Sequence, residues 1–144
     1  MFKKALFSLI TLQFLTAFFH ALSFLSSPRA TNETEKQLID LMVGYKQDMG
    51  MGISRSTYDL FKGLSTCFAF ICILGGWINL YFLKTNLDAT HWKGLLRIES
   101  IVFGAVFIAM MVFTFLPPIV LTGMITSAAL FAWYRSDKIE PIAP

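Results

Sequence analysis

The stretch ISRSTYDLFKGLSTCFAFICILGGWINLYFL, residues 53–83, decides the fold of this chain. It opens with polar and charged residues and then continues for about twenty residues without a charge, the length that an α-helix needs to cross a bilayer. Ser56 precedes Asp59 by three residues, which is the spacing of a capping box, so we expect Asp59 in the first helical turn. We expect Lys62 to extend its ammonium group back to the membrane interface. The stretch therefore predicts a transmembrane helix, and Asp59 and Lys62 at its start need no catalytic role.

The composition of the whole chain agrees with a membrane protein. Of its 144 residues, 56% are hydrophobic and 15% are charged, whereas a soluble domain usually carries about 25% charged residues. The net charge of +3 comes from 12 basic and nine acidic residues that are scattered rather than clustered. We therefore expect membrane lipid as a partner and no nucleic acid.

Cysteine and histidine spacing argues against metals and cofactors. Cys67 and Cys72 are five residues apart inside one apolar run, so they point in different directions on a helix, and they do not form a CxxC pair. His20 and His91 fall near opposite membrane faces, so they cannot ligate one haem together. No His, Cys and carboxylate spacing supports zinc. We predict no metal and no cofactor.

Three further apolar runs complete the predicted architecture. The spans are expected at residues 5–25, 63–83, 92–116 and 118–134, with Pro117 and Pro118 breaking the helix between the last two. The sequence thus predicts an all-α membrane protein, with residues 1–144 forming a single transmembrane domain. We expect this domain to be an antiparallel four-helix transmembrane bundle.

The loop at residues 29–62 is the only sizeable polar segment. Thr31 or Asn32 can cap a helix that continues through ETEKQLIDLMVGYKQDM, residues 33–49. Its apolar positions form one stripe, consisting of Leu38, Leu41, Met42, Tyr45 and Met49. This pattern predicts an amphipathic helix in the first extramembrane loop, lying on the bilayer surface or capping the bundle. A partner-binding helix is the alternative. The MGMG sequence at residues 49–52 is expected to be a flexible break.

Charges near the helix ends predict the orientation. Seven basic residues lie in the N-terminus, the 84–97 connection and the C-terminal tail, namely Lys3, Lys4, Lys84, Lys93, Arg97, Arg135 and Lys138. The five basic residues of the 29–62 loop are offset by five acids. The positive-inside rule therefore favours two cytoplasmic termini and an extracytoplasmic 29–62 loop in a multi-pass protein of the cell membrane. Lys3 and Lys4 before an apolar run resemble a signal peptide, but this run is longer than the usual ~7–15 residues, and Pro28 disfavours cleavage at Ser26-Ser27.

Small and polar residues recur at helical spacing and mark the expected packing faces. The first two spans carry Gln13, Thr16, His20, Ser23 and Ser27, and Ser65, Ala69, Cys72, Gly76 and Asn79, respectively. The last two carry Ser100, Gly104, Ala105 and Ala109, and Thr122, Thr126 and Ala129. Because membrane helices associate through such residues, we expect these faces to turn inward.

The candidate site is a polar pocket formed by Gln13, His20, Ser56 and Asp59. An ionisable group inside a span suggests a functional site, and a carboxylate could orient the imidazole of His20. The alternative is a neutral histidine that is hydrogen-bonded to Ser65 or to a backbone carbonyl. Glu99 is expected to reach a basic residue, either Lys84 or Arg135.

Two pieces of the chain resemble an uncharacterised bacterial family. These pieces are FFHALSFLSSP, residues 18–28, and MGISRSTYDLFKGLS, residues 51–65. The likeness covers roughly residues 9–83 and is carried by His20, Pro28, Ser56, Asp59, Gly63 and Ser65. The resemblance implies a small four-span inner-membrane protein and carries no activity.

Three function classes remain open from the sequence. We expect first a non-enzymatic accessory or interaction module, with a protein partner or a second copy of itself, and no residue is assigned a catalytic role. The second class is a binding protein or membrane enzyme for a lipophilic substrate, acting at the His20 and Asp59 pocket. The third is a subunit of an oligomeric transporter, for which the sequence lacks the repeats typical of transporters.

Overall fold

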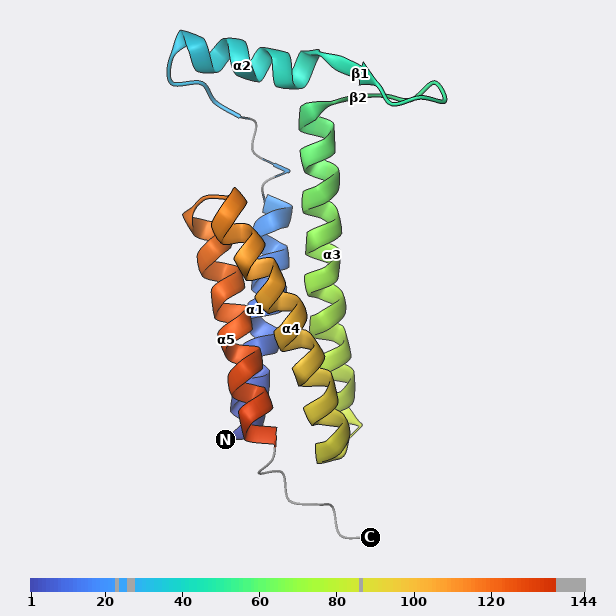
Figure 1. Cartoon of the computed structure of the whole chain (residues 1–144), viewed down its shortest axis with the longest axis vertical. Coiled ribbons are helices and arrows are strands. Elements are labelled where there is room, and N and C mark those ends of the chain that lie inside the picture. The colour runs from blue at the N-terminus through green and yellow to red at the C-terminus, as the bar shows by residue number, and fades with distance from the viewer. Residues whose placement is uncertain (23, 26–27, 86, 137–144) are drawn as a thin grey trace. The chain divides into compact units, whose positions relative to one another are not determined.

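The chain is mostly helical. A computed structural model describes residues 1–22, 24–25, 28–85 and 87–136. Within them the elements are α1 (Phe2–Leu22), α2 (Glu33–Gly44), β1 (Lys46–Asp48), β2 (Ser54–Ser56), α3 (Thr57–Lys84), α4 (Ala89–Phe113) and α5 (Leu116–Ser136) (Figure 1). Four of these helices, α1, α3, α4 and α5, are long and apolar enough to cross a membrane. The predicted predominance of helix and the four apolar helices long enough to span a membrane are confirmed, although two short strands accompany them.

Polar side chains cap the starts of two helices. α3 starts at Thr57, directly after Ser56, which places Asp59 in its first turn as the capping box predicts, ahead of the membrane span expected from residue 63. α4 starts at Ala89 because Asp88 Oδ1 accepts hydrogen bonds from the backbone N–H groups of Thr90 and His91, at 2.9 and 3.1 Å. α1 ends at Leu22 rather than at residue 25. Three residues used in the sequence argument, Ser23, Ser27 and Lys138, lie outside the described residues.

The turn between α4 and α5 does not lie at the two prolines. α4 ends at Phe113, where Thr114 donates its backbone N–H to the carbonyl of Met110, and α5 already begins at Leu116. Pro117 and Pro118 therefore stand in the first turn of α5. Proline is favoured there because the first N–H groups of a helix have no intrahelical acceptor. The prolines start the last helix instead of separating it from the previous one.

The predicted helix over residues 33–49 is wrong in its last third. α2 ends at Gly44, and Lys46–Asp48 pairs antiparallel with Ser54–Ser56, with Lys46 opposite Ser56. The expected flexible break is the turn of this hairpin, where Gly50, Met51 and Gly52 have φ angles of 84°, 56° and 77°. Two glycines permit this left-handed backbone without steric cost. Tyr45 and Met49 consequently lie outside the helix.

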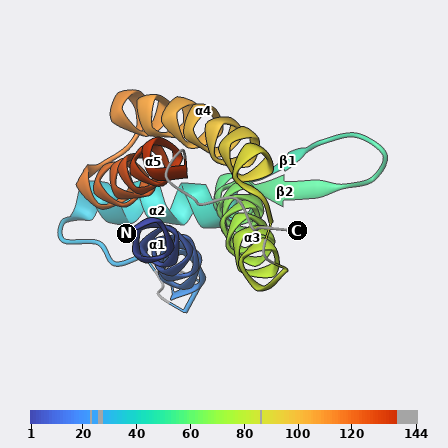
Figure 2. The same cartoon turned by 90° about the horizontal axis from the view of Figure 1, so that it is seen from below.

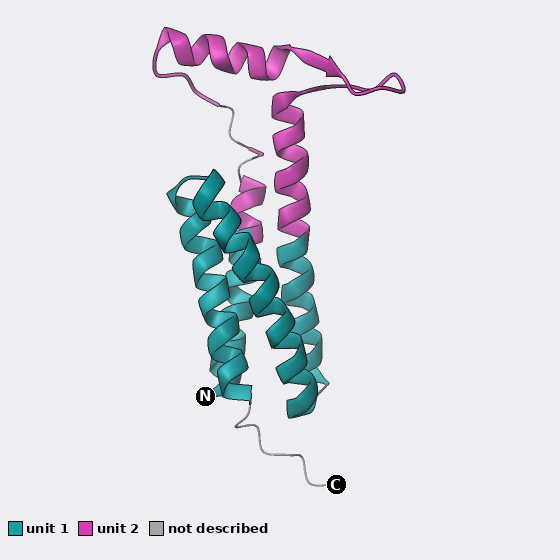
Figure 3. Cartoon of the chain, in the orientation of Figure 1, with its two compact units in different colours: residues 1–16, 71–144 teal, residues 17–70 magenta. Residues whose placement is uncertain are grey.

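The chain divides into two compact units, drawn in different colours in Figure 3. Unit 1 consists of Met1–Thr16 and Ile71–Pro144, and contains parts of all four long helices. Unit 2 is Ala17–Phe70, and contains the end of α1, the helix α2, the hairpin and the start of α3. In unit 1, α4 and α5 lie side by side, as the views in Figures 1 and 2 agree. Each unit is described separately below.

Unit 1 is held together by buried apolar side chains and by close helix contacts at glycines. Its fully buried apolar residues are Leu6, Leu9, Cys72, Leu96, Ile125, Ala129 and Ala132. A Cβ at Gly76 would lie 3.0 Å from the ring of Phe14, and one at Gly123 would lie 3.0 Å from the ring of Phe107. The missing side chains therefore let α1 approach α3 and α4 approach α5, as small residues do in membrane bundles.

The predicted packing faces hold for most helices. Gln13, Thr16, Cys72 and Asn79 are fully buried, and Ser100, Thr122 and Ala129 are buried as well. On α4, however, Ala105 and Ala109 are exposed. Trp92 and Phe103 occupy the buried side of that helix instead. Larger side chains fill the interface there.

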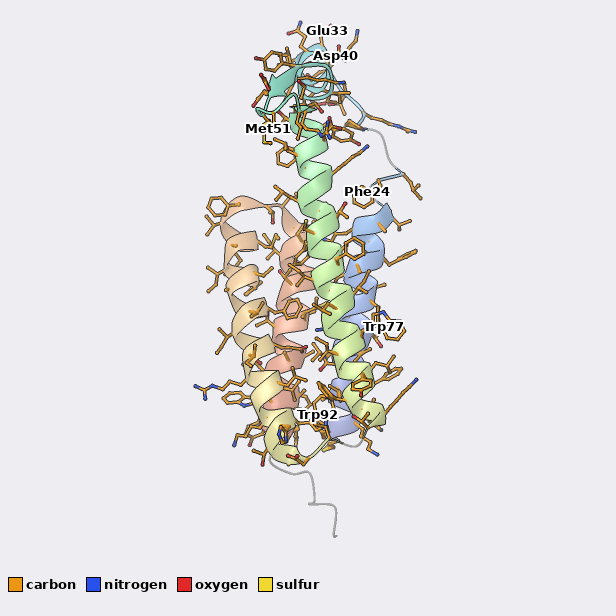
Figure 4. The ribbon with its side chains drawn as sticks, turned by 90° about the vertical axis from the view of Figure 1, so that its right-hand side faces the viewer. Phe24, Glu33, Asp40, Met51, Trp77 and Trp92 are labelled. Carbon is orange, nitrogen blue, oxygen red and sulfur yellow. The ribbon has the colours of Figure 1, made fainter. Side chains whose placement is uncertain are left out.

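Trp92 is buried in unit 1, although it stands near the start of α4. Its ring packs edge-on against Phe2, with ring centroids 5.5 Å apart, and against Phe82, at 6.4 Å. Figure 4 shows it among the side chains at the N-terminal end of α4. Tyr81 and Tyr134 are exposed instead. The tryptophan thus joins three helices rather than facing a membrane interface.

Candidate functional site

A cluster of three polar side chains lies inside unit 1, one from each of three helices. Asn79 of α3 donates its amide nitrogen to the two carboxylate oxygens of Glu99 on α4, at 2.9 and 3.0 Å. The same nitrogen lies 3.2 Å from the side-chain oxygen of Gln13 on α1. Gln13 and Asn79 are fully buried and Glu99 is only 7% exposed. We call Gln13, Asn79 and Glu99 the amide–carboxylate cluster.

The amide–carboxylate cluster is not fully hydrogen-bonded. One amide nitrogen of Asn79, with two hydrogens, faces three acceptor oxygens. Asn79 Oδ1, Gln13 Nε2 and Thr16 Oγ1 are buried and have no hydrogen-bond partner among the described residues. Buried polar atoms are normally paired, so these three atoms can each take part in a further hydrogen bond.

Gly75 makes room for this cluster. A Cβ at Gly75 would lie 2.7 Å from Gln13 Nε2 and 3.6 Å from Glu99 Oε1. The amide of Gln13 and the carboxylate of Glu99 therefore both border the space that a side chain at residue 75 would need. Gly75 thus lets two buried polar side chains approach the α3 backbone, and Gly76 does the same for the ring of Phe14.

His20 lies in unit 2, where it bonds to Ser65. Its Nδ1 is 2.8 Å from Ser65 Oγ, and its ring packs edge-on against Phe68, with centroids 4.9 Å apart. Ser65 is one of the two hydrogen-bond partners that the sequence suggested for this histidine, whereas its neutral state stays a prediction. His20 is half-buried, and the bond ties the end of α1 to the start of α3.

Ser56 and Asp59 form the capping box that the sequence predicts. The backbone N–H of Ser56 donates to Asp59 Oδ2 at 3.0 Å, and that of Asp59 donates to Ser56 Oγ at 3.1 Å. Lys62 places its ammonium 4.4 Å from the centre of the Tyr58 ring, an aromatic support for a basic group at a helix start. Asp59 also lines a shallow open depression with Arg55, Leu60, Gly63 and Leu64.

The four predicted pocket residues are divided between the two units. Gln13 belongs to unit 1, and His20, Ser56 and Asp59 belong to unit 2. The joint pocket stays a prediction. Glu99 was expected to reach Lys84 or Arg135, but its carboxylate binds Asn79. Arg135 instead lies over the rings of Phe131 and Tyr134, at 5.1 and 5.9 Å from their centres.

Electrostatic effects outside the spans are local to helix starts. Asp88 accepts hydrogen bonds from His91, which hold the pKa of its carboxyl group below the usual range. Glu35 accepts two hydrogen bonds from Thr31, at 2.6 Å from the hydroxyl and 2.7 Å from the backbone, and these lower its pKa. Asn32 caps the same helix by accepting the backbone N–H of Glu35 at 2.8 Å. These groups stabilise helix ends.

No metal-binding group of three or more His, Cys, Asp or Glu side chains occurs among the described residues. Comparison of the chain with protein-family models, curated proteins and solved structures finds no match in any of the three. With its carboxylate and amide oxygens, the amide–carboxylate cluster can bind a hydrogen-bond donor or a small cation.

The sequence predicts that Gln13 and Asn79 lie on inward faces, but it does not predict that Glu99 joins them. The sequence feature that could have indicated the cluster is the distance of each residue from the end of its helix. Glu99 lies ten residues after Ala89, where α4 begins, and Asn79 lies five residues before Lys84, where α3 ends. Both residues thus lie inside their helices at the end where α3 connects to α4. Their convergence depends on helix rotation, which spacing within one helix does not reveal.

Proposed function

We propose that this chain is a small multi-pass protein of the bacterial cytoplasmic membrane that acts as a non-enzymatic interaction module. Its four apolar helices would cross the bilayer as an antiparallel bundle with both termini in the cytoplasm. The 29–62 segment, with α2 and the hairpin, would then face the outside. The sidedness rests on the distribution of basic residues around the helix ends.

The observation that carries the interaction role is the exposed apolar surface of α2. Among its described residues none is buried, and Leu38 and Leu41 are 57% and 65% exposed. An isolated helix of 12 residues is marginal in water. Its cap at Asn32 fixes only the first turn. We infer that α2 gains the remaining stability by placing its apolar stripe on a partner protein beside the membrane.

The buried cluster supports an accessory role over a transport role. A transport path through an oligomer would present Gln13 and Asn79 to a neighbouring subunit. Both side chains are instead fully buried and directed at each other within one chain. The lipophilic-substrate alternative would use the depression at Asp59, and there the carboxylate already serves the helix cap.

Site-specific photo-cross-linking tests the proposed function. A photoreactive residue at Leu38 should give a discrete protein adduct in native membranes. The matched variant at Lys36, on the opposite side of α2, should give much less. Lipid adducts alone at Leu38 would make α2 a surface helix and overturn the interaction role.

The proposed sidedness of the membrane topology is tested by cysteine labelling. Met51→Cys should react with a charged maleimide in intact cells, and Thr85→Cys should react only after permeabilisation.

A further inference from the structure

We propose that the amide–carboxylate cluster binds one exchangeable proton on the Glu99 carboxyl group, inside the membrane. This inference rests on the proposed placement of the helices across the bilayer but not on the partner-binding role of α2. The proton would add to a carboxylate oxygen from water and return to water. No other bond would form or break.

The numbers of hydrogen-bond donors and acceptors in the cluster match only when Glu99 carries a proton. With Glu99 ionised, the two hydrogens of Asn79 Nδ2 face two carboxylate oxygens and the oxygen of Gln13, while Asn79 Oδ1 has no donor. With Glu99 protonated, the acid and amide can pair cyclically: the Asn79 N–H donates to the acid carbonyl, and the acid O–H donates to Asn79 Oδ1. The second Asn79 hydrogen remains for Gln13. Three donors then meet three acceptors.

The charge around the carboxylate also favours the acid. The groups beside it are two neutral amides, those of Asn79 and Gln13. The lysine and arginine side chains of unit 1, within the described residues, are Lys3, Lys4, Lys84, Lys93, Arg97 and Arg135. All but Arg135 are exposed, and the Arg135 guanidinium lies over two aromatic rings. His91, exposed at the start of α4, is bonded to Asp88. A buried carboxylate without a cation beside it is strongly favoured to take up a proton.

The cluster also has a group suited to the ionised state of Glu99. Gln13 Nε2 is an unpaired buried donor beside the same Gly75 surface as Glu99 Oε1. After proton loss, this N–H is available to the carboxylate. The amide of Asn79 therefore suits the protonated form of Glu99, and the amide of Gln13 suits the ionised form. Since both forms have a hydrogen-bond partner, the proton is exchangeable rather than fixed. A sodium ion fits the geometry less well, since Asn79 directs nitrogen, not oxygen, at the carboxylate.

Chemical modification tests the proposal on the full chain in lipid vesicles. A hydrophobic carbodiimide reacts with protonated carboxyl groups inside membranes, and mass spectrometry locates the adduct. We expect modification at Glu99 that decreases as the pH rises and that sodium chloride does not change relative to choline chloride. Gln13→Leu should move the midpoint upward by about one pH unit or more, because it removes the donor available to the anion.

Infrared spectroscopy provides a second measurement that does not depend on the folding of a Gln13 variant. The wild-type protein should show a carboxylic-acid carbonyl band that disappears with increasing pH and that Glu99→Gln lacks. Absence of both the adduct and the band from about pH 4 to about pH 9 would overturn the proposal. Specific protection by sodium would also overturn it, by making the metal ion the occupant. Neither outcome bears on the cross-linking experiment at α2.

Discussion

Asn79 donates one amide nitrogen to both carboxylate oxygens of Glu99, at 2.9 and 3.0 Å, and thereby joins α3 to α4. We expect Asn79→Ala to destabilise the protein by about 1–3 kcal/mol, because it leaves a buried acid without its donor. Thermal unfolding in mild detergent measures this loss. Leu74→Ala, on the exposed side of the same helix, is the matched control and should have a smaller effect.

A double-mutant cycle separates the pair from general packing. Glu99→Gln keeps the size of the side chain but removes its ionisable group. If the two residues interact as described, the effects of Asn79→Ala and Glu99→Gln will be non-additive by ~0.5 kcal/mol or more. Additive effects would show that the ionisable group of Glu99 adds nothing measurable to its interaction with Asn79.

The glycine at residue 76 should not tolerate even a methyl group. Gly76→Ala would place a Cβ 3.0 Å from the ring of Phe14, so α1 and α3 must separate or the ring must turn. We expect a loss of about 1–3 kcal/mol, typical of overpacking. Gly63→Ala is the control, since nothing lies within 4 Å of its Cβ and alanine favours a helix.

A smaller ring partner should rescue the Gly76 variant. Phe14→Leu reduces the group that the new methyl meets, so the double variant should be more stable than Gly76→Ala alone. Thermal unfolding of the four proteins in the same detergent gives the comparison. An unchanged stability in Gly76→Ala would mean that α1 and α3 do not approach closely at this point.

The sequence predicts helix number and helix starts well because both depend on local chemistry. Apolar length identifies a span, and the spacing of Ser56 and Asp59 identifies a capping box that the structure contains. The hairpin was missed for a related reason. Residues 33–49 follow one helical stripe, but Gly50 and Gly52 permit a turn that lets Lys46–Asp48 pair with Ser54–Ser56. Pairing over that distance is not visible in helical periodicity.

The partner of Glu99 was missed because the prediction relied on charge. A carboxylate near basic residues is expected to pair with one of them, and Lys84 and Arg135 are both near the ends of their helices. The carboxylate instead lies on the buried side of α4, where the amide of Asn79 is within reach and the long basic side chains are not its bonding partners. Which side of a helix faces which neighbour is a tertiary property.

The start of α2 should melt in acid. Hydrogen bonds from Thr31 lower the pKa of Glu35 in the folded state. A lowered folded pKa means that the stabilisation is complete above the unfolded pKa and is lost as the pH falls through the folded one. We therefore expect faster amide exchange in the first turn of α2 below about pH 4. In Glu35→Gln this pH dependence should vanish, whereas in Glu33→Gln it should persist.

Lipid, rather than protein, should cover the apolar exterior of α3. Leu74 is 60% exposed and Met51, at the hairpin turn, is 100% exposed. In a Cys67→Ser background, a charged maleimide should modify Met51→Cys in native membranes and leave Leu74→Cys unmodified, because the reagent does not enter hydrocarbon. Both cysteines should react after denaturation in detergent. Cys72 is buried and serves as an internal reference that reacts only after denaturation. Equal rates at residues 51 and 74 in the native protein would mean that water surrounds α3, and the chain would not span a membrane there.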